Sequence, residues 1–285
     1  MPRLLRLDAE LVRRGLARSR EQARELVLAG RVTVGGTTAR KPATSVRTDA
    51  DLVVRPDDDA PAYASRGGHK LAGALAATMP AGLAVAGRRC LDAGASTGGF
   101  TDVLLRHGAA EVLAVDVGYG QLVWELQTDA RVRVHDRTNV RELTLDLLGG
   151  VEPVDLVVGD LSFISLRLVL PALSRVTADD GDLLLMVKPQ FEVGKQALGK
   201  GGVVRDPAHR AQSVHDVARA AEALGWGTRA VATSPLPGPS GNVEFFVWLR
   251  RDAAALDLAL LHGAVDGLDA AWQPSLSAAD ERVGP

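Results

Sequence analysis

The sequence predicts an α/β protein whose main part is a doubly wound, mostly parallel sheet, preceded by a small basic module of helices and strands. Two observations predict the sheet: apolar runs alternate with helical patterns after about residue 88, and the first run leads into a glycine-rich loop. The third observation is charge. Residues 1–56 carry 12 Lys and Arg against six Asp and Glu, whereas the rest carry 21 against 29, so the formal net charge of −2 hides two parts of opposite sign.

Composition narrows the class of protein. With 46% hydrophobic and 24% charged residues among 285, the chain is neither collagen-like, nor a disulfide scaffold, nor wholly disordered. Its single cysteine, Cys90, excludes an intramolecular disulfide and a cysteine zinc site, and favours a reducing compartment. Asp8 and Glu10 interrupt any signal-peptide pattern, and no run reaches the roughly 18–20 apolar residues that span a bilayer. We therefore expect a cytoplasmic protein that binds neither membrane nor metal.

The basic module is expected to begin with two short helices. Residues 8–14 have a helical pattern that stops at Gly15. Ser19 then begins a second helix, with Gln22 as its capping-box partner, and Gly30 ends it.

Two strands complete the module. Residues 31–34 and 51–54 are short apolar runs, the first followed by a Gly-Gly turn, and we expect them to pair. The stretch after them contains three consecutive aspartates between prolines, which is typical of a linker. We place the module at residues 1–56 and the linker at 57–64.

The remaining chain alternates strands and helices. Five strands are expected at residues 90–93, 112–115, 132–134, 155–158 and 183–187. Asp206 and Pro207 then cap a long helix that continues to about Leu224. Two late strands, 229–231 and 243–249, suggest an antiparallel hairpin at one edge of the sheet.

A glycine-rich loop follows the first strand and precedes a helix, so its backbone N–H groups can face a ligand. It consists of Gly94, Ala95, Ser96, Thr97, Gly98 and Gly99. Ser96 stands where a dinucleotide fingerprint has its second glycine, and a tight turn with a helix cap would explain the loop by itself.

Three acidic residues bear on what the loop binds. Asp116, at the end of the second strand, can accept hydrogen bonds from the ribose of either NAD or S-adenosylmethionine. Asp92 favours S-adenosylmethionine, because an acid at this position can bind the cationic methionyl amine of that cofactor. NAD has no equivalent amine. Asp136, at the end of the third strand, can contact an adenine amino group or can be a solvated acid.

Three ionisable residues fall at or beside the carboxyl ends of expected strands, where open α/β sheets bind ligands: Asp160, Lys188 and Glu244. Lys188 follows a run of five apolar residues. Burial lowers the pKa of a lysine, and a lysine with a lowered pKa can help to deprotonate a hydroxyl. The alternative is a lysine whose side chain extends from the strand end into solvent. Lys70, taken alone, is expected to be an ordinary surface lysine.

Four segments together resemble one family. Residues 65–71 (Ser-Arg-Gly-Gly-His-Lys-Leu), 92–101, 160–163 (Asp-Leu-Ser-Phe) and 188–192 (Lys-Pro-Gln-Phe-Glu) are similar to those of the TlyA family. These are ribosomal RNA 2′-O-methyltransferases with an N-terminal S4-type RNA-binding domain and an FtsJ-like catalytic domain. The resemblance implies a Rossmann-like class I fold with a mostly parallel seven-stranded sheet and an antiparallel edge strand. It places the catalytic domain at residues 65–252 and a C-terminal helix and tail at 253–285.

The resemblance also implies roles. The family's Lys-Asp-Lys-Glu tetrad falls on Lys70, Asp160, Lys188 and Glu244, so that Lys188 with Asp160 and Lys70 activates a ribose 2′-hydroxyl and Glu244 orients the set. The glycine loop and Asp116 would hold S-adenosylmethionine. The implied partner is 16S or 23S ribosomal RNA, or both, and the implied modified nucleotide is cytidine. We expect the protein to be a monomer.

Two sequence facts support methylation of a hydroxyl. Cys90 precedes the glycine loop, so the cysteine nucleophile of cytosine C5-methylation is missing from the expected site. Residues 160–163 also lack the prolines of the motif that amino-group methyltransferases often carry there.

The linker departs from the family pattern. The family usually has Arg-x-Trp before the Ser-Arg-Gly segment, whereas this chain has Pro61-Ala62-Tyr63-Ala64. Tyr63 can keep the aromatic role, but Pro61 carries no charge, which puts any coupling of RNA and cofactor binding through the linker in doubt.

Basic residues of the module are the candidates for RNA contact. They are Arg6, Arg18, Arg20, Arg24, Arg31 and Lys41, joined by Arg66 at the entry to the second part. The guanidinium fork suits phosphate, and such contacts position the protein without reading sequence. A solvated charged face is the alternative, and S4 modules also serve other RNA enzymes, so the module implies structured RNA and not the reaction.

Three other functions stay open from sequence. A membrane-active haemolysin would need a better span than residues 253–265, which Asp257 and His262 interrupt. A non-catalytic RNA-binding factor for ribosome assembly would use the module without the tetrad. An NAD-linked oxidoreductase would use the glycine loop alone.

Overall fold

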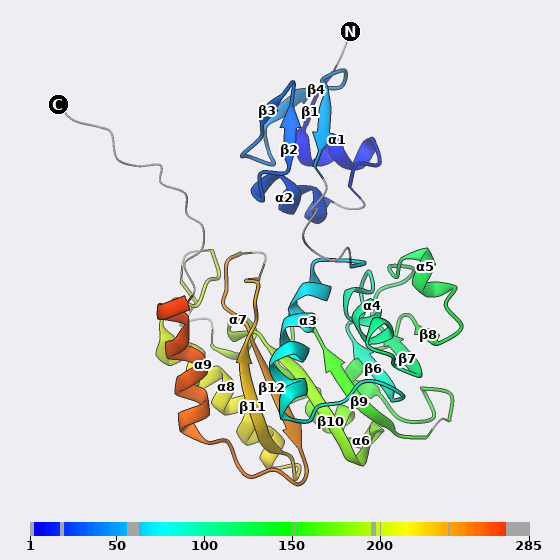
Figure 1. Cartoon of the computed structure of the whole chain (residues 1–285), viewed down its shortest axis with the longest axis vertical. Coiled ribbons are helices and arrows are strands. Elements are labelled where there is room, and N and C mark those ends of the chain that lie inside the picture. Colours follow the sequence, from blue (N-terminus) through cyan, green and yellow to red (C-terminus); the bar gives the residue numbers. More distant parts are fainter. Residues whose placement is uncertain are drawn as a thin grey trace, which may run out of the picture. The chain divides into compact units, whose positions relative to one another are not determined.

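The computed structural model describes residues 3–17, 20–55, 63–150, 152–194, 198–199, 201–238 and 240–271. The chain divides into two compact units, Met1–Ala62 and Tyr63–Pro285, drawn from blue to red along the sequence in Figure 1. Each is described by itself.

The first unit contains the two expected helices, α1 (Leu7–Arg13) and α2 (Arg20–Leu28). Its strands are β1 (Leu4–Arg6), β2 (Val32–Val34), β3 (Thr37–Thr38), β4 (Ser45–Arg47) and β5 (Leu52–Val54). The predicted strand pair is confirmed as β2 with β5, which run antiparallel, and β3 and the separate β1–β4 pair are additions. The additional strands contain few apolar residues, only Leu4, Leu5 and Val46, so no apolar pattern marked them in the sequence. Ser19 and the side chain of Gln22, the expected cap, lie outside the described residues.

A small core holds this unit together. Both helices bury one face, with Leu7, Leu11, Ala23 and Val27 fully buried against Val32 of β2. The arginines of α2 therefore lie on the solvent side, as the helical spacing predicts.

The second unit is built on a seven-stranded sheet of order β11-β12-β10-β9-β6-β7-β8. Its strands are β6 (Arg89–Ala93), β7 (Glu111–Val115), β8 (Val132–His135), β9 (Val154–Gly159), β10 (Thr177–Val187), β11 (Gly227–Thr233) and β12 (Phe245–Arg250). All neighbours pair in parallel except β12, which runs antiparallel to both β10 and β11. The predicted fold class, a mostly parallel sheet with an antiparallel hairpin at one edge, is confirmed.

Helices cover both faces of the sheet (Figure 1). They are α3 (Gly67–Thr78), α4 (Gly99–Arg106), α5 (Trp124–Gln127), α6 (Leu170–Val176), α7 (Pro189–Glu192), α8 (Pro207–Glu222) and α9 (Leu258–Ala271). Short 3₁₀ turns, η1 (Met79–Ala81), η2 (Val140–Glu142) and η3 (Leu166–Leu168), lie between them.

Alternate strand residues face two separate cores. Cys90, Val112 and Leu184 pack with α3 and α4, whereas Leu91 and Val157 pack with α6, α8 and α9. Burial on both faces explains why these strands read as continuous apolar runs. Among the described residues, no helix is both long and apolar enough to cross a membrane.

One predicted strand is longer than expected. β10 begins at Thr177, and its pairing with β9 is irregular between Thr177 and Asp182. Its polar first half gave no apolar pattern to read. The predicted start of α8 is confirmed, because the Asp206 carboxylate accepts a hydrogen bond from the N–H of Ala208 at 2.9 Å.

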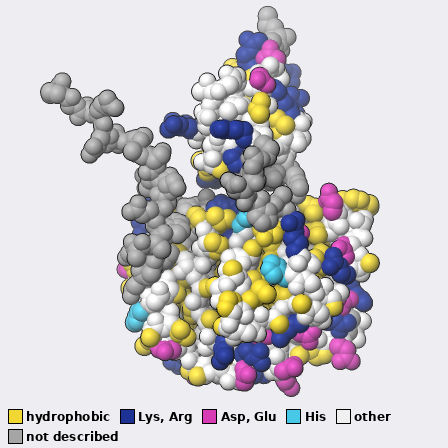
Figure 2. Space-filling view, in the orientation of Figure 1, with side chains coloured by type: hydrophobic (Ala, Val, Ile, Leu, Met, Phe, Trp, Pro, Cys, Tyr) yellow, Lys and Arg dark blue, Asp and Glu magenta, His cyan; other side chains and the backbone are white. Residues whose placement is uncertain are grey.

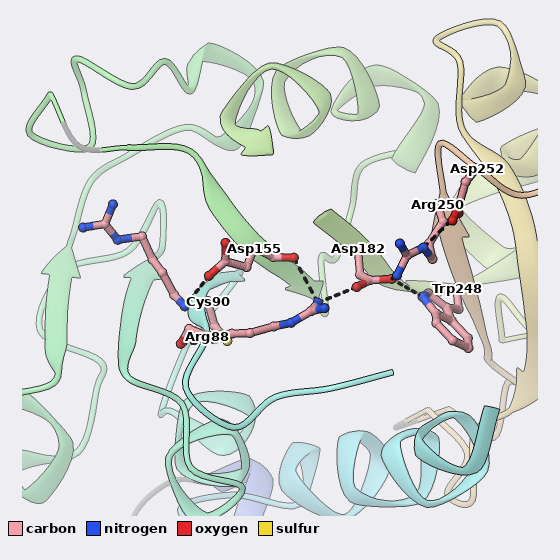
Figure 3. Close-up of polar contacts among 8 residues, drawn as sticks. Arg88, Cys90, Asp155, Asp182, Trp248, Arg250 and Asp252 are labelled. Atoms are coloured by element: carbon pink, nitrogen blue, oxygen red, sulfur yellow. Dashed lines mark hydrogen bonds and ion pairs between the residues drawn. The ribbon is translucent and has the colours of Figure 1, made fainter. Parts of the chain in front are cut away.

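The amino-terminal edge of the sheet is held by a buried carboxylate, shown in Figure 3. Asp182 is fully buried and accepts hydrogen bonds from Arg88, from the Trp248 indole N–H at 2.6 Å and from Arg250 at 3.5 Å. Asp182 lies in β10, Trp248 and Arg250 lie in the adjacent β12, and Arg88 immediately precedes β6, all away from the edge where ligands bind. Nearby Cys90 is also buried, which raises the pKa of its thiol to about 12.

Candidate active site

Three of the predicted catalytic residues flank the ends of adjacent strands. Asp160 immediately follows β9, and Lys188 immediately follows β10. Glu244 immediately precedes β12, which is antiparallel to β10 with Val187 opposite Phe245. The register therefore brings Lys188 and Glu244 to neighbouring positions at the carboxyl edge of the sheet.

Lys188 is held in the site and does not reach out to solvent. Its Nζ forms an ion pair with Asp160 Oδ1 at 2.5 Å and donates a hydrogen bond to Ser162 Oγ at 2.8 Å. The whole residue is only 7% exposed. This geometry leaves the ammonium or amine group fixed by two oxygen atoms from the loop after β9.

Lys70 forms the second ion pair. Its Nζ lies 2.5 Å from Glu244 Oε2, and the two side chains are 7% and 0% exposed. The surface position expected for Lys70 from sequence alone is therefore wrong, because α3 packs against the sheet and turns this residue inward. The other oxygen of Glu244 accepts a long hydrogen bond, 3.5 Å, from the Gln190 amide.

The two pairs adjoin. A Cβ at Gly67, in the first turn of α3, would lie 3.7 Å from Asp160 Oδ2, so the helix that carries Lys70 also contacts the first pair. Gln190, which contacts Glu244, is two residues from Lys188. Two positive and two negative groups thus form one nearly dry cluster, and such burial is tolerated because every charge has a partner.

The glycine loop lies directly beside this cluster. Gly94 has φ +88°, and a Cβ there would come 3.0 Å from the backbone oxygen of Asp160. Gly98, with φ +98°, precedes α4, and a Cβ there would clash with Leu126. Ser96 also has a positive φ, +47°. The loop therefore needs glycine at Gly94 and Gly98 to pass close to its neighbours at the start of α4.

Asp92 gives a test of whether the residues around the loop fit S-adenosylmethionine. It is fully buried, its Oδ2 accepts a hydrogen bond from Thr101 Oγ1 at 2.7 Å, and its Oδ1 has no partner among the described residues. Burial raises the pKa of this carboxyl to about 7. A buried acceptor without a protein donor is costly, and a ligand ammonium is the kind of group that would satisfy it. The residues present fit the cofactor.

The other two acids bind the backbone of the loops that follow β6 and β7. Asp116 accepts hydrogen bonds from the N–H groups of Ser96 at 2.8 Å and Gly118 at 2.7 Å. Asp136 accepts one from the N–H of Gly120 at 2.9 Å. Both acids thus shape the turn beside the glycine loop, and their contacts with ribose and adenine stay predictions.

Phe163 is a feature of the site that sequence reasoning missed. Its side chain is 91% exposed, its φ is +64°, and its ring centroid lies 5.2 Å from that of Phe191. A bulky residue with positive φ is a backbone outlier, and such strain gathers at functional sites. The signal available in the sequence was an aromatic residue three positions after Asp160, in the loop that follows the buried strand β9.

The aromatic residue of the linker motif is anchored within the second unit. The Tyr63 ring lies 4.9 Å below the Arg106 guanidinium and 5.0 Å edge-on from His69. The next N–H, from Ala64, donates to Asp102 Oδ2 at 2.8 Å. Tyr63 is therefore fixed to α3 and α4, whereas Pro61 and Ala62 lie outside the described residues and the coupling question stays a prediction.

In the first unit, two of the candidate RNA-binding arginines share a buried carboxylate. Asp8 pairs with Arg6 at 2.7 Å and Arg20 at 3.2 Å, and the hydrogen bond from Arg6 is the main reason why the pKa of Asp8 falls to about 2. Both arginine side chains stay more than half exposed. The carboxylate orients two guanidinium groups that can still reach a phosphate.

Glu10 is a second buried carboxylate that orients two arginines, Arg13 and Arg14. Arg13 and Arg14 lie 2.6 and 2.7 Å from its fully buried carboxylate, and these contacts, that of Arg13 foremost, lower the pKa of Glu10 to about 2. Arg14 also donates to the backbone oxygens of Thr48 and Ala50. Arg14 therefore has a structural role. The count of basic residues in the module could not distinguish such a structural arginine from one that binds RNA.

The remaining basic candidates differ in setting. Arg24 and Lys41 are exposed, and Arg31 donates to the backbone oxygen of Arg55 at 2.9 Å. Arg66, in the second unit, donates to that of Pro237 at 3.1 Å, and Arg18 lies outside the described residues. Figure 2 shows Lys and Arg side chains, in dark blue, repeatedly on the visible surface of the first unit.

A glycine loop at the carboxyl edge of this sheet, beside a buried Lys-Asp-Lys-Glu cluster, defines a Rossmann-like methyltransferase, and a separate basic domain accompanies it. Comparison with known families agrees: the FtsJ-like methyltransferase model matches residues 63–251, and the S4 domain model matches residues 5–52. The chain belongs to the FtsJ-like methyltransferase family and, within it, to the TlyA proteins.

Individual relatives support this assignment. The chain is 61% identical over 250 residues to the 16S/23S rRNA (cytidine-2′-O)-methyltransferase TlyA of Mycobacterium tuberculosis H37Rv, covering 88% of this chain and 91% of that protein. It is 33% identical over 241 residues to Hemolysin A of Brachyspira hyodysenteriae, covering 85% and 98%. A solved structure of a putative hemolysin from Streptococcus thermophilus superposes with a TM-score of 0.74 at 36% identity, covering 95% and 97%. The predicted resemblance to the TlyA family is confirmed.

Proposed function

We propose that the protein transfers a methyl group from S-adenosylmethionine to the 2′-hydroxyl of a cytidine in 16S or 23S ribosomal RNA, or both. The observation that carries the proposal is the cluster of two buried lysine–carboxylate pairs beside the glycine loop. The rRNA (cytidine-2′-O)-methyltransferase activity named for the M. tuberculosis relative supports the substrate and the atom that is modified. A cytoplasmic location and a monomeric state accompany this proposal as predictions.

The cofactor would be held by the loop Gly94–Gly99, with the free Oδ1 of Asp92 available to its methionyl ammonium and Asp116 to its ribose. When bound there, S-adenosylmethionine would supply an electrophilic methyl group, carried on a sulfonium, for transfer to the hydroxyl oxygen. Gly94 lies against Asp160, and this contact between the glycine loop and the Lys-Asp-Lys-Glu cluster supports the proposal.

Lys188 is the residue that we assign to the reacting hydroxyl. Asp160 and Ser162 hold its Nζ at the carboxyl edge of the sheet, where it can hydrogen-bond the ribose 2′-oxygen. The hydroxyl proton passes to the Lys188–Asp160 pair as the oxygen becomes nucleophilic. Lys70 would help Lys188 and Asp160 to activate the hydroxyl through its positive charge, and Glu244, its buried partner, would orient the set.

RNA would be bound in two ways. The arginines of the first unit contact phosphates, which positions the RNA and makes the affinity fall steeply with salt. Phe163 offers an exposed aromatic face next to Asp160 and Lys188, and unstacked bases bind such faces in proteins that act on RNA. A cytidine turned out of its stack can therefore rest on Phe163 while its ribose meets Lys188.

The test is transfer of tritiated methyl groups to separate 30S and 50S ribosomal subunits, followed by nucleoside analysis. We expect 2′-O-methylcytidine from the wild type and a loss of at least about 100-fold in rate for Lys188→Ala, because general acid–base catalysis contributes 10²–10⁴-fold. RNA affinity should change no more than a few fold. Arg219→Ala, an exposed change on α8, is the matched control.

Three results would contradict the proposal. Label on a base would exclude ribose methylation. A normal rate for Lys188→Ala would exclude the assigned role of that lysine. Tight binding of subunits by a wild type that transfers no methyl group would favour the non-catalytic assembly factor.

A further inference from the structure

Glu192 is a buried carboxylate to which the reaction described above gives no role. It ends α7, four residues after Lys188, and its side chain is 2% exposed. Its Oε2 accepts a hydrogen bond from Ser165 Oγ at 2.5 Å, and its Oε1 accepts one from the N–H of Leu166 at 2.7 Å. Arg167 lies 3.4 Å from the same carboxylate. Three groups of one short segment thus converge on Glu192.

That segment is the far end of the loop that begins at Asp160. The near end is held by Lys188, which contacts Asp160 and Ser162. Because Lys188 and Glu192 both belong to the short stretch that follows β10 and includes α7, one segment holds both ends of the loop. Between the two anchors lies Phe163.

Phe163 has a conformation that needs such anchors. Its φ of +64° is unfavourable for a bulky residue, and its ring is 91% exposed, so burial of its own side chain does not hold it there. The ring contacts Phe191, the neighbour of Glu192, with centroids 5.2 Å apart. The strain persists because the flanking residues are fixed, and the contacts of Glu192 fix Ser165 and Leu166.

We propose that Glu192 is a positioning residue that holds Phe163 in the orientation that receives the target base. The inference rests on the proposed function, in which Phe163 stacks on a base. Without the carboxylate, the N–H of Leu166 loses its acceptor and the loop relaxes toward ordinary backbone angles, so Phe163 must be ordered at the time of binding. The effect falls on RNA and not on the cofactor, because the side-chain partners of Glu192 that the structure describes are Ser165, Leu166 and Arg167, and not the residues of the glycine loop.

The experiment is a double-mutant cycle in the full-length protein with Glu192→Ala, Phe163→Ala and the combination. KM for ribosomal subunits and kcat are measured with tritiated cofactor, the affinity for S-adenosylmethionine by calorimetry, and the affinity for subunit RNA by filter binding. Loss of one base–aromatic stack reduces RNA affinity by about tenfold. We expect an increase of about tenfold in KM for each single variant, at unchanged affinity for S-adenosylmethionine.

The double variant decides the question. If Glu192 acts through Phe163, removing it from a chain that already lacks Phe163 changes KM less than about twofold. Glu192→Gln should recover most of the wild-type KM, because its amide oxygen still accepts from Leu166. Glu222→Ala, a partly exposed glutamate at the end of α8, is the control and should match the wild type.

Additive losses in the double variant would overturn the proposal, as would a Glu192→Ala variant with wild-type KM. If Glu192→Ala does not fold, Ser165→Ala, which removes the hydroxyl that donates to Glu192, replaces it in the same cycle. The proposed function fails separately, if the wild type transfers no methyl group. In that case the affinities for subunit RNA, which can be measured without turnover, are compared across the same variants. Additive losses of RNA affinity in the double variant would then overturn the role of Glu192.

Discussion

Replacing Lys70 by methionine separates the structural from the catalytic importance of the buried cluster. The change keeps the length of the side chain and removes only the ammonium that lies 2.5 Å from Glu244 Oε2. Glu244, whose side chain is 0% exposed, then keeps a single long hydrogen bond from Gln190 at 3.5 Å. An uncompensated carboxylate is left inside the protein.

The magnitude follows from that burial. Removing one partner of a buried ion pair costs about 3–5 kcal/mol, whereas replacing both partners by neutral groups of similar size costs little. Lys70→Met should therefore lower the urea midpoint of the second unit by about 1–2 M, for a slope of about 2–3 kcal/mol/M. The double variant Lys70→Met/Glu244→Gln should recover stability to within about 1–2 kcal/mol of the wild type.

Activity should behave differently. Because the proposed reaction uses the charges of the cluster, the double variant should stay at least about 100-fold below the wild-type rate even though its stability returns. Tryptophan fluorescence is the appropriate probe of unfolding, since all four tryptophans follow residue 63 and report only on the second unit.

Two results would refute this reasoning. A Lys70→Met variant with the urea midpoint of the wild type would show that the ion pair is not buried as the structure has it. A double variant that regains activity together with stability would show that the second pair only supports the fold.

Four further outcomes are expected. Contacts with arginine hold the pKa values of Asp8 and Glu10 near 2, below their ordinary values of 3.8 and 4.5. These two carboxylates therefore stabilise the first unit above about pH 4.5, and their contribution is lost as the pH falls toward 2. Hydrogen exchange of residues 3–55, measured against pH, should show this loss of stability. Asp182→Asn should cost about 3–5 kcal/mol in urea unfolding, because it leaves buried arginine and indole donors with a poorer acceptor, while RNA affinity stays unchanged. Cys90 should resist iodoacetamide at pH 8 in the native protein and react on unfolding, since burial keeps the thiol protonated. Arg24→Gln should reduce the slope of log affinity for RNA against log salt by about 1.

Local patterns were sufficient for most of the second unit. Each central strand is buried on both faces and so appears in the sequence as an apolar run, and Asp206 with Pro207 marks a helix start by local chemistry alone. The strands β1, β3 and β4 of the first unit were missed, because they contain few apolar residues. The early start of β10 was missed because its first half is polar.

The candidate site divides in the same way. Asp160 and Lys188 could be selected from sequence since each directly follows an apolar strand. Lys70 could not, because its position on a helix says nothing about the partner that it meets 174 residues away. Phe163 and Glu192 fell within the family segments, but no role was predicted for them, because backbone strain and burial are not visible in a sequence.

The sequence by itself determined the division into a basic and an acidic part, the order of the strands in the second unit, and the residues that stand at the ends of those strands, because charge and hydrophobic period are local properties. Only the tertiary structure decided which charges pair, which acceptor is left free at Asp92, and how Glu192 and Lys188 hold the loop that exposes Phe163. These depend on strand order and register, which bring together residues far apart in the chain. Contacts of that kind follow from the packing of the whole sheet and not from any window of sequence.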